Sequence, residues 1–212
     1  MNSPRSALLT TVGRTSADFD ASAIAADLGL RHLDLVSIVP TDTPDEPAPI
    51  RRLIAEEPLT DGAALISGTG NVSYDSEAAA ALGIPVVFIV DKRGLTEKLA
   101  VREAEGYLAT VGAVLTEDEV TAEAIAEAIS GVDTTPVMSP DYLQTWLQKK
   151  AQEKTTRIVL PEGDDDRILQ AAHEVLAEGI CELIILGEKE TVTSRATELG
   201  LDISRAEIID HL

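Results

Sequence analysis

Short runs of valine, isoleucine and leucine alternate along this chain with longer alanine-rich segments of helical periodicity. The apolar runs contain few polar residues, which is typical of strands buried on both faces of a sheet. This alternation favours α/β units around a mostly parallel sheet. The runs predict strands at residues 7–12, 33–39, 63–67, 85–90, 112–115, 157–160, 182–186 and 207–209. The segments between them predict helices at residues 20–28, 75–82, 96–108, 121–129, 140–152, 165–178 and 189–199.

A break in this pattern lies at residues 131–138. One helix ends before it, and the next begins with Ser139 as N-cap and Pro140 at the first helical position. We therefore place a domain boundary here. Residues 1–135 are predicted to form a three-layer α/β domain with a mostly parallel sheet. Residues 136–212 are predicted to form an incomplete β-α-β-α-β start of a second α/β domain.

The chain is strongly acidic, with 17 lysines and arginines against 37 aspartates and glutamates, a net charge of −20. Such a surface repels nucleic acid and anionic membranes, so neither is expected as a partner. An anionic small ligand is not excluded, because a local pocket can still be positive. No apolar run approaches the roughly 20 residues that span a bilayer. The single cysteine, Cys181, favours a reducing compartment, and we expect a cytoplasmic protein.

Two segments of the N-terminal domain are candidate ligand loops. Val12–Ser16 lies where an α/β nucleotide-binding domain has its phosphate loop, but the second glycine and the lysine of that motif are missing, which disfavours an ATPase. Ser67–Asn71 follows a predicted strand, and Gly68 and Gly70 could turn backbone N–H groups toward an anion. The alternative for these two glycines is a tight structural turn.

The segment from Arg157 onward, RIVLPEGDDDR, is the most informative part of the sequence. We expect residues 157–160 to form a short buried strand and residues 161–163 a turn. Residues 164–166 bring three carboxylates to a helix N-terminus, where they complement the helix dipole. Consecutive helical residues point in different directions, so these carboxylates do not converge on one ion and no metal site is expected.

This segment resembles the opening of the catalytic domain of phosphate acetyltransferase. The preceding helix, residues 139–154, resembles the lead-in helix of that family. Residues 1–135 resemble a shortened, degenerate dethiobiotin-synthetase-like domain, as in long bacterial members, without its phosphate-loop residues. The catalytic-domain resemblance is carried by Arg157-Ile-Val-Leu-Pro-Glu-Gly-Asp, Arg167, Ala171-Ala172, Gly179-Ile180 and Leu186-Gly187.

The resemblance implies transfer of an acetyl group between coenzyme A and inorganic phosphate. Its substrates would be acetyl-CoA and phosphate, with no permanently bound cofactor. The enzyme's task is to position two anionic reactants and to stabilise an oxyanion. In the family, the arginines that bind phosphate and the serine and aspartate near the thioester lie downstream of the opening motif. The catalytic residues are therefore expected beyond Leu212, and we expect this chain to be a truncated form that is inactive by itself.

Pro161, Glu162 and Arg167 match the opening motif and are candidate coenzyme A-binding residues. Arg167 could contribute positive potential to a cleft. The alternative roles are structural: a turn for Pro161, a helix-capping carboxylate for Glu162 and a surface salt bridge for Arg167.

A second hypothesis is a non-catalytic regulatory or oligomerisation module of such an enzyme. The predicted strands at 182–186 and 207–209 are apolar and lack further neighbours, which favours pairing with another chain. We expect a homo-oligomer. Trp146, the only tryptophan, is expected to pack its helix against a domain. Phosphate-dependent release of coenzyme A from acetyl-CoA distinguishes the enzyme from the module.

Overall fold

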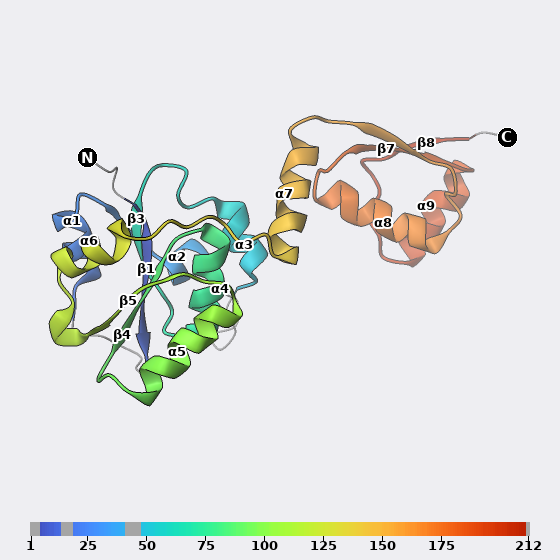
Figure 1. Cartoon of the computed structure of the whole chain (residues 1–212). Coiled ribbons are helices and arrows are strands. Elements are labelled where there is room, and N and C mark those ends of the chain that lie inside the picture. Colours follow the sequence, from blue (N-terminus) through green and yellow to red (C-terminus); the bar gives the residue numbers. More distant parts are fainter. Residues whose placement is uncertain (1–4, 14–18, 41–47, 211–212) are drawn as a thin grey trace. The chain divides into compact units, whose positions relative to one another are not determined.

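The computed structural model describes residues 5–13, 19–40 and 48–210 (Figure 1). Residues 14–16 of the segment compared with a phosphate loop lie outside these ranges. The chain divides into two compact units, residues 1–143 and 144–212. Each unit is built around its own parallel sheet. Among the described residues, no helix combines the length and the apolar character needed to cross a membrane.

The first unit has five parallel strands in the order β2-β3-β1-β4-β5. The central strand β1 pairs with β3 on one side and with β4 on the other, so that Leu9 lies opposite both Ser67 and Val87. All five residues of β4 are buried, as the uninterrupted apolar run predicted. The strands are β1 (Ala7–Val12), β2 (Arg31–Asp34), β3 (Ala64–Ser67), β4 (Val86–Val90) and β5 (Val111–Thr116).

Helices cover both faces of this sheet and make the three predicted layers. Along β1, Leu8 and Val12 pack into the core on one face, whereas Ala7 and Leu9 pack into the core on the other. The second face is covered by α1 (Ala21–Asp27) and α6 (Ala122–Ser130), and a short 3-10 turn (Glu117–Glu119) follows β5. The first face is covered by α2 (Leu35–Ile38), α3 (Ile50–Glu56), α4 (Val72–Leu82) and α5 (Leu95–Gly106).

Helix α2 occupies residues that the sequence predicted as a strand. The predicted strand 33–39 ends at Asp34, whose side chain accepts a hydrogen bond from the N–H of Val36 at 2.9 Å and caps α2. Helix α3 was not predicted at all. Helix α4 begins at Val72 rather than residue 75, because Asn71 caps it by accepting from the N–H of Tyr74. The corrections at α2 and α4 arise from side-chain caps that override the apolar periodicity, whereas α3 begins after Pro49 without a side-chain cap.

The link between the units stays attached to the first unit beyond the predicted boundary at residue 135. The Thr134 hydroxyl donates to the carbonyl oxygen of Gly83 at 2.6 Å. The N–H of Val137 donates to the carbonyl oxygen of Ala80 at 2.8 Å. Helix α7 (Pro140–Gln152) then contains the position, between residues 143 and 144, at which the two compact units divide.

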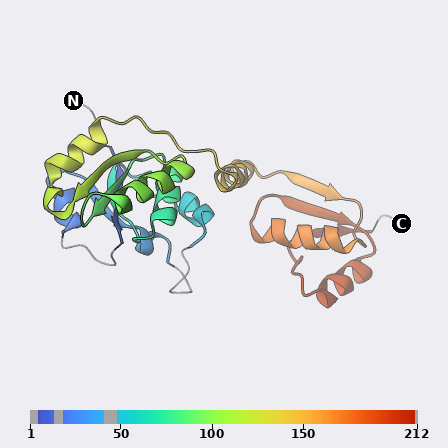
Figure 2. The ribbon, with the colours of Figure 1, turned by 60° about the horizontal axis from the view of Figure 1, so that its bottom comes forward.

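The second unit has the predicted β-α-β-α-β order, with three parallel strands arranged β6-β7-β8. Its helices α8 (Asp166–Ala177) and α9 (Lys189–Glu198) pack on one face of that sheet. Figure 2 shows both helices on the same side of the strands. The strands are β6 (Arg157–Leu160), β7 (Glu182–Leu186) and β8 (Glu207–Ile209).

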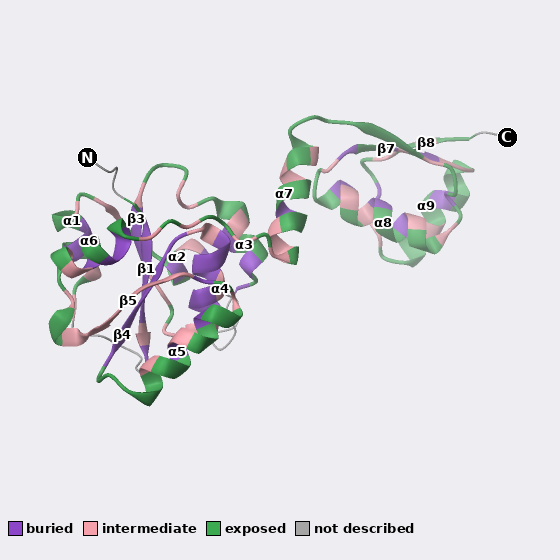
Figure 3. Ribbon diagram, in the orientation of Figure 1, coloured by how far each residue is buried: buried purple, intermediate pink, exposed green. Residues whose placement is uncertain are grey.

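Strand β6 corrects one prediction, since residues 157–160 are not buried. Ile158 is 45% exposed and Val159 is 50% exposed. In Figure 3 the strand that follows α7 is coloured as exposed over most of its length. The strand lies at the edge of the sheet, so it has a neighbour on one side only. An apolar run predicts that a segment forms a strand. Whether the side chains of that strand are buried depends on the elements that flank it.

Candidate functional site

The carboxyl edge of the second sheet brings the family-motif residues together. Strand β6 ends at Leu160, and the loop from Pro161 to Asp165 leads into α8. The N–H of Gly163 donates to the carbonyl oxygen of Leu186 at 3.1 Å, so the loop lies directly on the end of β7. Carboxyl edges of parallel strands are where α/β proteins usually bind ligands.

Gly163 is required by this close approach. A Cβ atom added there would lie 2.6 Å from the carbonyl oxygen of Leu186 and 2.8 Å from Cγ2 of Ile185. Any larger residue would push the loop off β7 and break the hydrogen bond to Leu186. The glycine of the motif therefore holds the loop against the sheet.

We expect Gly163→Ala to lower the free energy of unfolding of the second unit by about 2 kcal/mol through this overpacking. Denaturation followed by Trp146 fluorescence measures it. Gly179→Ala is the matched control in the same unit, because Gly179 has φ +65° and open space around its Cβ position. It should cost only about 1 kcal/mol for the left-handed backbone. Equal losses in the two variants would contradict the contact at Gly163.

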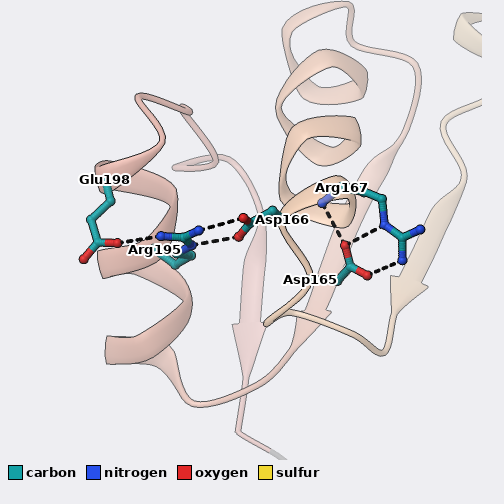
Figure 4. Close-up of polar contacts among 5 residues, drawn as sticks. All are labelled: Asp165, Asp166, Arg167, Arg195 and Glu198. Atoms are coloured by element: carbon teal, nitrogen blue, oxygen red, sulfur yellow. Dashed lines mark hydrogen bonds and ion pairs between the residues drawn. The ribbon is translucent and has the colours of Figure 1, made fainter.

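Two bidentate ion pairs order the start of α8 (Figure 4). Asp165 accepts from Arg167, with Nε to Oδ1 at 3.1 Å and Nη2 to Oδ2 at 2.6 Å. Asp166 accepts from Arg195 of α9, with Nε to Oδ1 at 2.7 Å and Nη2 to Oδ2 at 2.6 Å. Arg195 also donates to Glu198 at 2.9 Å. Arg167 and Arg195 thus present their planar guanidinium groups in fixed orientations.

Asp165 is the N-cap of α8 and also holds the side chain of Arg167. Its carboxylate accepts from the backbone N–H of Arg167 at 2.8 Å in addition to the guanidinium. The hydrogen bond from the Arg167 side chain, followed by that from its N–H, lowers the pKa of Asp165 to about 2. Arg195 similarly lowers the pKa of Asp166. Both carboxylates are therefore ionised at neutral pH.

The structure places the three candidate residues of the motif at this edge. Pro161 and Glu162 are exposed in the turn, and Arg167 has a side chain that is 87% exposed. The capping carboxylate is Asp165 rather than Glu162, which corrects that structural alternative. The guanidinium of Arg167 pairs with Asp165, and that pairing together with the nearby Glu162 carboxylate raises its pKa. Arg167 is consequently a permanent positive charge open to an anion.

The sequence did not indicate Arg195, which lies in α9 and reaches the same edge of the sheet by its ion pair with Asp166. It is 29 residues from its partner Asp166, and no local pattern links the two. Among the described residues, no group of three or more histidine, cysteine, aspartate or glutamate side chains is placed to hold a metal ion. Cys181 is buried, and burial raises the pKa of its thiol, so it behaves as a small apolar side chain.

The loop of Gly68 and Gly70 in the first unit surrounds an anion supplied by the protein itself. The Asp75 carboxylate is fully buried and accepts from the N–H of Gly70 at 3.0 Å and from the N–H of Thr69 at 3.0 Å. The N–H of Gly68 donates to the carbonyl oxygen of Leu9. Neither glycine N–H is left for an external anion, and the geometry supports the structural-turn alternative.

Asp75 also binds two hydroxyl groups, those of Thr10 at 2.6 Å and Thr69 at 2.9 Å. It thereby ties the loop after β3 to the central strand β1. A Cβ on Gly68 would lie 2.7 Å from its Oδ2 atom, which is why a glycine stands there. Burial raises the pKa of Asp75, and the hydrogen bonds partly offset that rise. No signal in the alanine-rich sequence of α4 pointed to this residue.

The second unit is similar to known proteins. Residues 142–212 match the family described as phosphate acetyl/butaryl transferase. A phosphate acetyltransferase of Corynebacterium glutamicum is 48% identical over 75 residues, which are 35% of this chain and 23% of that protein. One of Helicobacter pylori is 42% identical over 74 residues, 35% of this chain and 14% of the relative. A phosphate acetyltransferase of Thermoanaerobacterium thermosaccharolyticum is 50% identical over 64 residues, which are 30% of this chain and 19% of that protein.

The matched segment thus spans less than a quarter of the length of these curated relatives. It contains the whole carboxyl edge described above, from Pro161 to Arg195. The dethiobiotin-synthetase-like character of residues 1–135 stays a prediction. Residues 142–212 are thus similar to the phosphate acetyl/butaryl transferase family and to the phosphate acetyltransferases named above.

Proposed function

We propose that this chain is part of a phosphate acetyltransferase that transfers acetyl between coenzyme A and inorganic phosphate. The observation that supports it is the family match of residues 142–212, with the exposed guanidinium of Arg167 at the carboxyl edge of the matched sheet. In the forward direction, a phosphate oxygen attacks the thioester carbonyl of acetyl-CoA. The carbon–sulfur bond then breaks, and the products are acetyl phosphate and the coenzyme A thiolate.

Arg167 is the residue of this chain that we assign to binding an anionic substrate. Both substrates carry phosphate groups, and an arginine fork suits phosphate oxygens. The N-terminal amides of α8 are already used, because the N–H groups of Arg167, Ile168 and Leu169 donate to Asp165. The side chain of Arg167 is 87% exposed, whereas that of Arg195 at the same edge is 42% exposed, so we choose Arg167 as the group that contacts the anion. Asp165 acts as a positioning residue that orients Arg167.

The test measures phosphate-dependent release of the coenzyme A thiol from acetyl-CoA. It uses this chain and, in parallel, the Corynebacterium glutamicum enzyme whose matched 75 residues are replaced by those of this chain. We expect the hybrid enzyme to be active. In the hybrid, Arg167→Gln should lower kcat/KM at least tenfold, which corresponds to about 1.4 kcal/mol of lost binding.

Lys154→Gln is the control, since Lys154 is exposed and precedes β6 at the other edge of the sheet. It removes the same unit of charge and should change kcat/KM less than about twofold. An inactive hybrid that is folded by circular dichroism would refute the proposed activity and favour the non-catalytic module. An active hybrid in which Arg167→Gln and Lys154→Gln behave alike would refute only the role of Arg167.

A further inference from the structure

A cavity of about 440 Å³ lies at the amino edge of the sheet in the first unit. Three adjacent strands begin beside it, because Arg5 and Ser6 precede β1, Ala63 precedes β3 and Pro85 precedes β4. All the residues that line it belong to residues 1–143, so the cavity lies within one compact unit. Its volume is in the range of small-molecule sites in proteins, which makes it a candidate binding site.

Two consecutive residues bring unused hydrogen-bond donors to this cavity. Ser6 is 9% exposed, and its hydroxyl oxygen accepts from the N–H of Ala64 at 2.9 Å, which leaves the hydroxyl proton without an acceptor among the described residues. Nη1 of Arg5 donates to the carbonyl oxygen of Val132 at 2.6 Å and to Oδ1 of Asp133 at 2.8 Å. Nε and Nη2 of Arg5 have no partner in the described ranges. A ligand of this cavity therefore needs acceptor atoms.

Arg31 places an unbalanced positive charge behind the wall of the cavity. Its Nη2 atom donates to the carbonyl oxygen of Gly62, a wall residue, at 3.1 Å and to that of Pro58 at 2.9 Å. Its Nε atom is buried without a hydrogen-bond partner, and no carboxylate pairs with this guanidinium in the part of the chain that the structure describes. Charged groups that leave water are normally paired with the opposite charge. The missing partner points to an anion that is not part of the chain.

We propose that this cavity binds the carboxylate of a small monoanionic ligand with a short hydrocarbon body. Because Arg5 already pairs with Asp133, Arg31 leaves one positive charge in excess around the cavity, which matches a monocarboxylate better than a phosphate dianion. The carboxylate accepts from the free N–H groups of Arg5 and from the hydroxyl of Ser6. The hydrocarbon part contacts the apolar wall, which consists of Leu59, Ala63, Ile84 and Pro85.

The carboxyl end of α4 lies at the same edge of the sheet, and a helix carboxyl end disfavours an anion. Its last carbonyl oxygens are already engaged as acceptors. That of Ala80 accepts from the N–H groups of Gly83 at 3.2 Å and Val137 at 2.8 Å. That of Gly83 accepts from the Thr134 hydroxyl at 2.6 Å. These hydrogen bonds offset much of the partial negative charge, so the arginines set the sign of the site.

The test measures binding of hexanoate to the full chain by amide NMR. We expect saturable shifts of the N–H signals of Ser6, Ala63 and Ala64, with a Kd of about 1 mM for a ligand of this size. Hexanamide, which has the same shape without the charge, should bind about tenfold more weakly or less. The readout is binding alone, so its outcome does not depend on the proposed transferase activity.

Two variants that break the same ion pair should have opposite effects on hexanoate binding. Arg5→Gln removes the guanidinium and should raise the Kd about tenfold or more. Asp133→Asn removes the carboxylate that competes with the ligand for Arg5, and it should lower the Kd about threefold. The Asp133 side chain is 97% exposed, so this variant should stay folded. Arg102→Gln, at an exposed arginine of α5 outside the cavity, is the charge control and should change the Kd less than about twofold.

Several results would overturn the proposal. They are the absence of saturable shifts up to about 50 mM hexanoate, equal binding of hexanamide, equal effects of Arg5→Gln and Arg102→Gln, and weaker binding to Asp133→Asn. Inorganic phosphate, titrated in parallel, tests the class of anion. If phosphate shifted the same signals more strongly than hexanoate, and Arg5→Gln abolished that shift, the cavity would be an oxyanion site and the carboxylate assignment would be wrong.

Discussion

Asp75→Ala is expected to lower the free energy of unfolding of the first unit by about 3 kcal/mol, the largest effect of a single polar substitution in the described residues. The change removes one fully buried carboxylate and leaves four donors without their acceptor. Each buried donor that loses its partner costs about 1 to 3 kcal/mol, and water entering the site offsets part of that sum. Hydrogen exchange of the β1 and β4 amides in the full chain measures the loss.

Ser76→Ala is the matched control for this experiment. Ser76 is the next residue of α4 and is also fully buried, but its hydroxyl has no hydrogen-bond partner among the described residues. Removing an unpaired buried hydroxyl should leave stability unchanged or raise it slightly. If Ser76→Ala destabilised the unit as much as Asp75→Ala, the effect would belong to packing in α4 and not to the hydrogen bonds of Asp75.

The contribution of Asp75 should also depend on pH with a defined sign. Burial raises its pKa in the folded state above the ordinary value of 3.8. A group with a raised folded pKa stabilises most below its unfolded pKa, and that contribution is lost as pH rises through the folded pKa. The stability difference between wild type and Asp75→Asn should therefore shrink as pH rises above 3.8, since the variant does not titrate there. A difference that grew with pH would contradict the raised pKa.

Gly83→Ala is expected to cost the first unit about 3 kcal/mol. Gly83 ends α4 at φ +66°, and a Cβ there would lie 2.4 Å from the backbone nitrogen of Pro136 and 2.8 Å from the carbonyl carbon of Thr135. The left-handed backbone costs an alanine about 1 kcal/mol, and the clash with main-chain atoms adds about 2 kcal/mol. The segment cannot move aside without breaking the hydrogen bond from Thr134 to Gly83.

Gly29→Ala separates the two costs. Gly29 has the same φ of +66°, but no atom lies within 4 Å of its Cβ position. The Gly29→Ala variant should therefore lower the free energy of unfolding by only about 1 kcal/mol, which is the cost of the left-handed backbone. Faster hydrogen exchange at the N–H of Val137 in Gly83→Ala would show that the link to the second unit has detached. Equal destabilisation by the two variants would contradict the contact between Gly83 and the link.

Local patterns in the sequence determined the elements and their class. The aliphatic runs predicted seven strands to within a few residues, because strand formation here needs only an apolar run that ends at a turn. Ser139 and Pro140 marked the start of α7, since capping is a local interaction. The motif from Arg157 to Asp164 indicated the family, which comparison then confirmed for residues 142–212. Strand 33–39 failed because the cap at Asp34 turned half of it into a helix.

The tertiary structure decided everything that depends on residues far apart in the chain. The order of strands makes β6 an exposed edge, although its sequence is as apolar as that of a central strand. The side chain of Asp75 fills the loop of Gly68 and Gly70. It accepts the hydrogen bonds of the backbone N–H groups of Thr69 and Gly70, which the sequence pattern suggested for an external anion. Burial and hydrogen bonding are set by neighbours in space, and no periodicity within one segment specifies which neighbours those are.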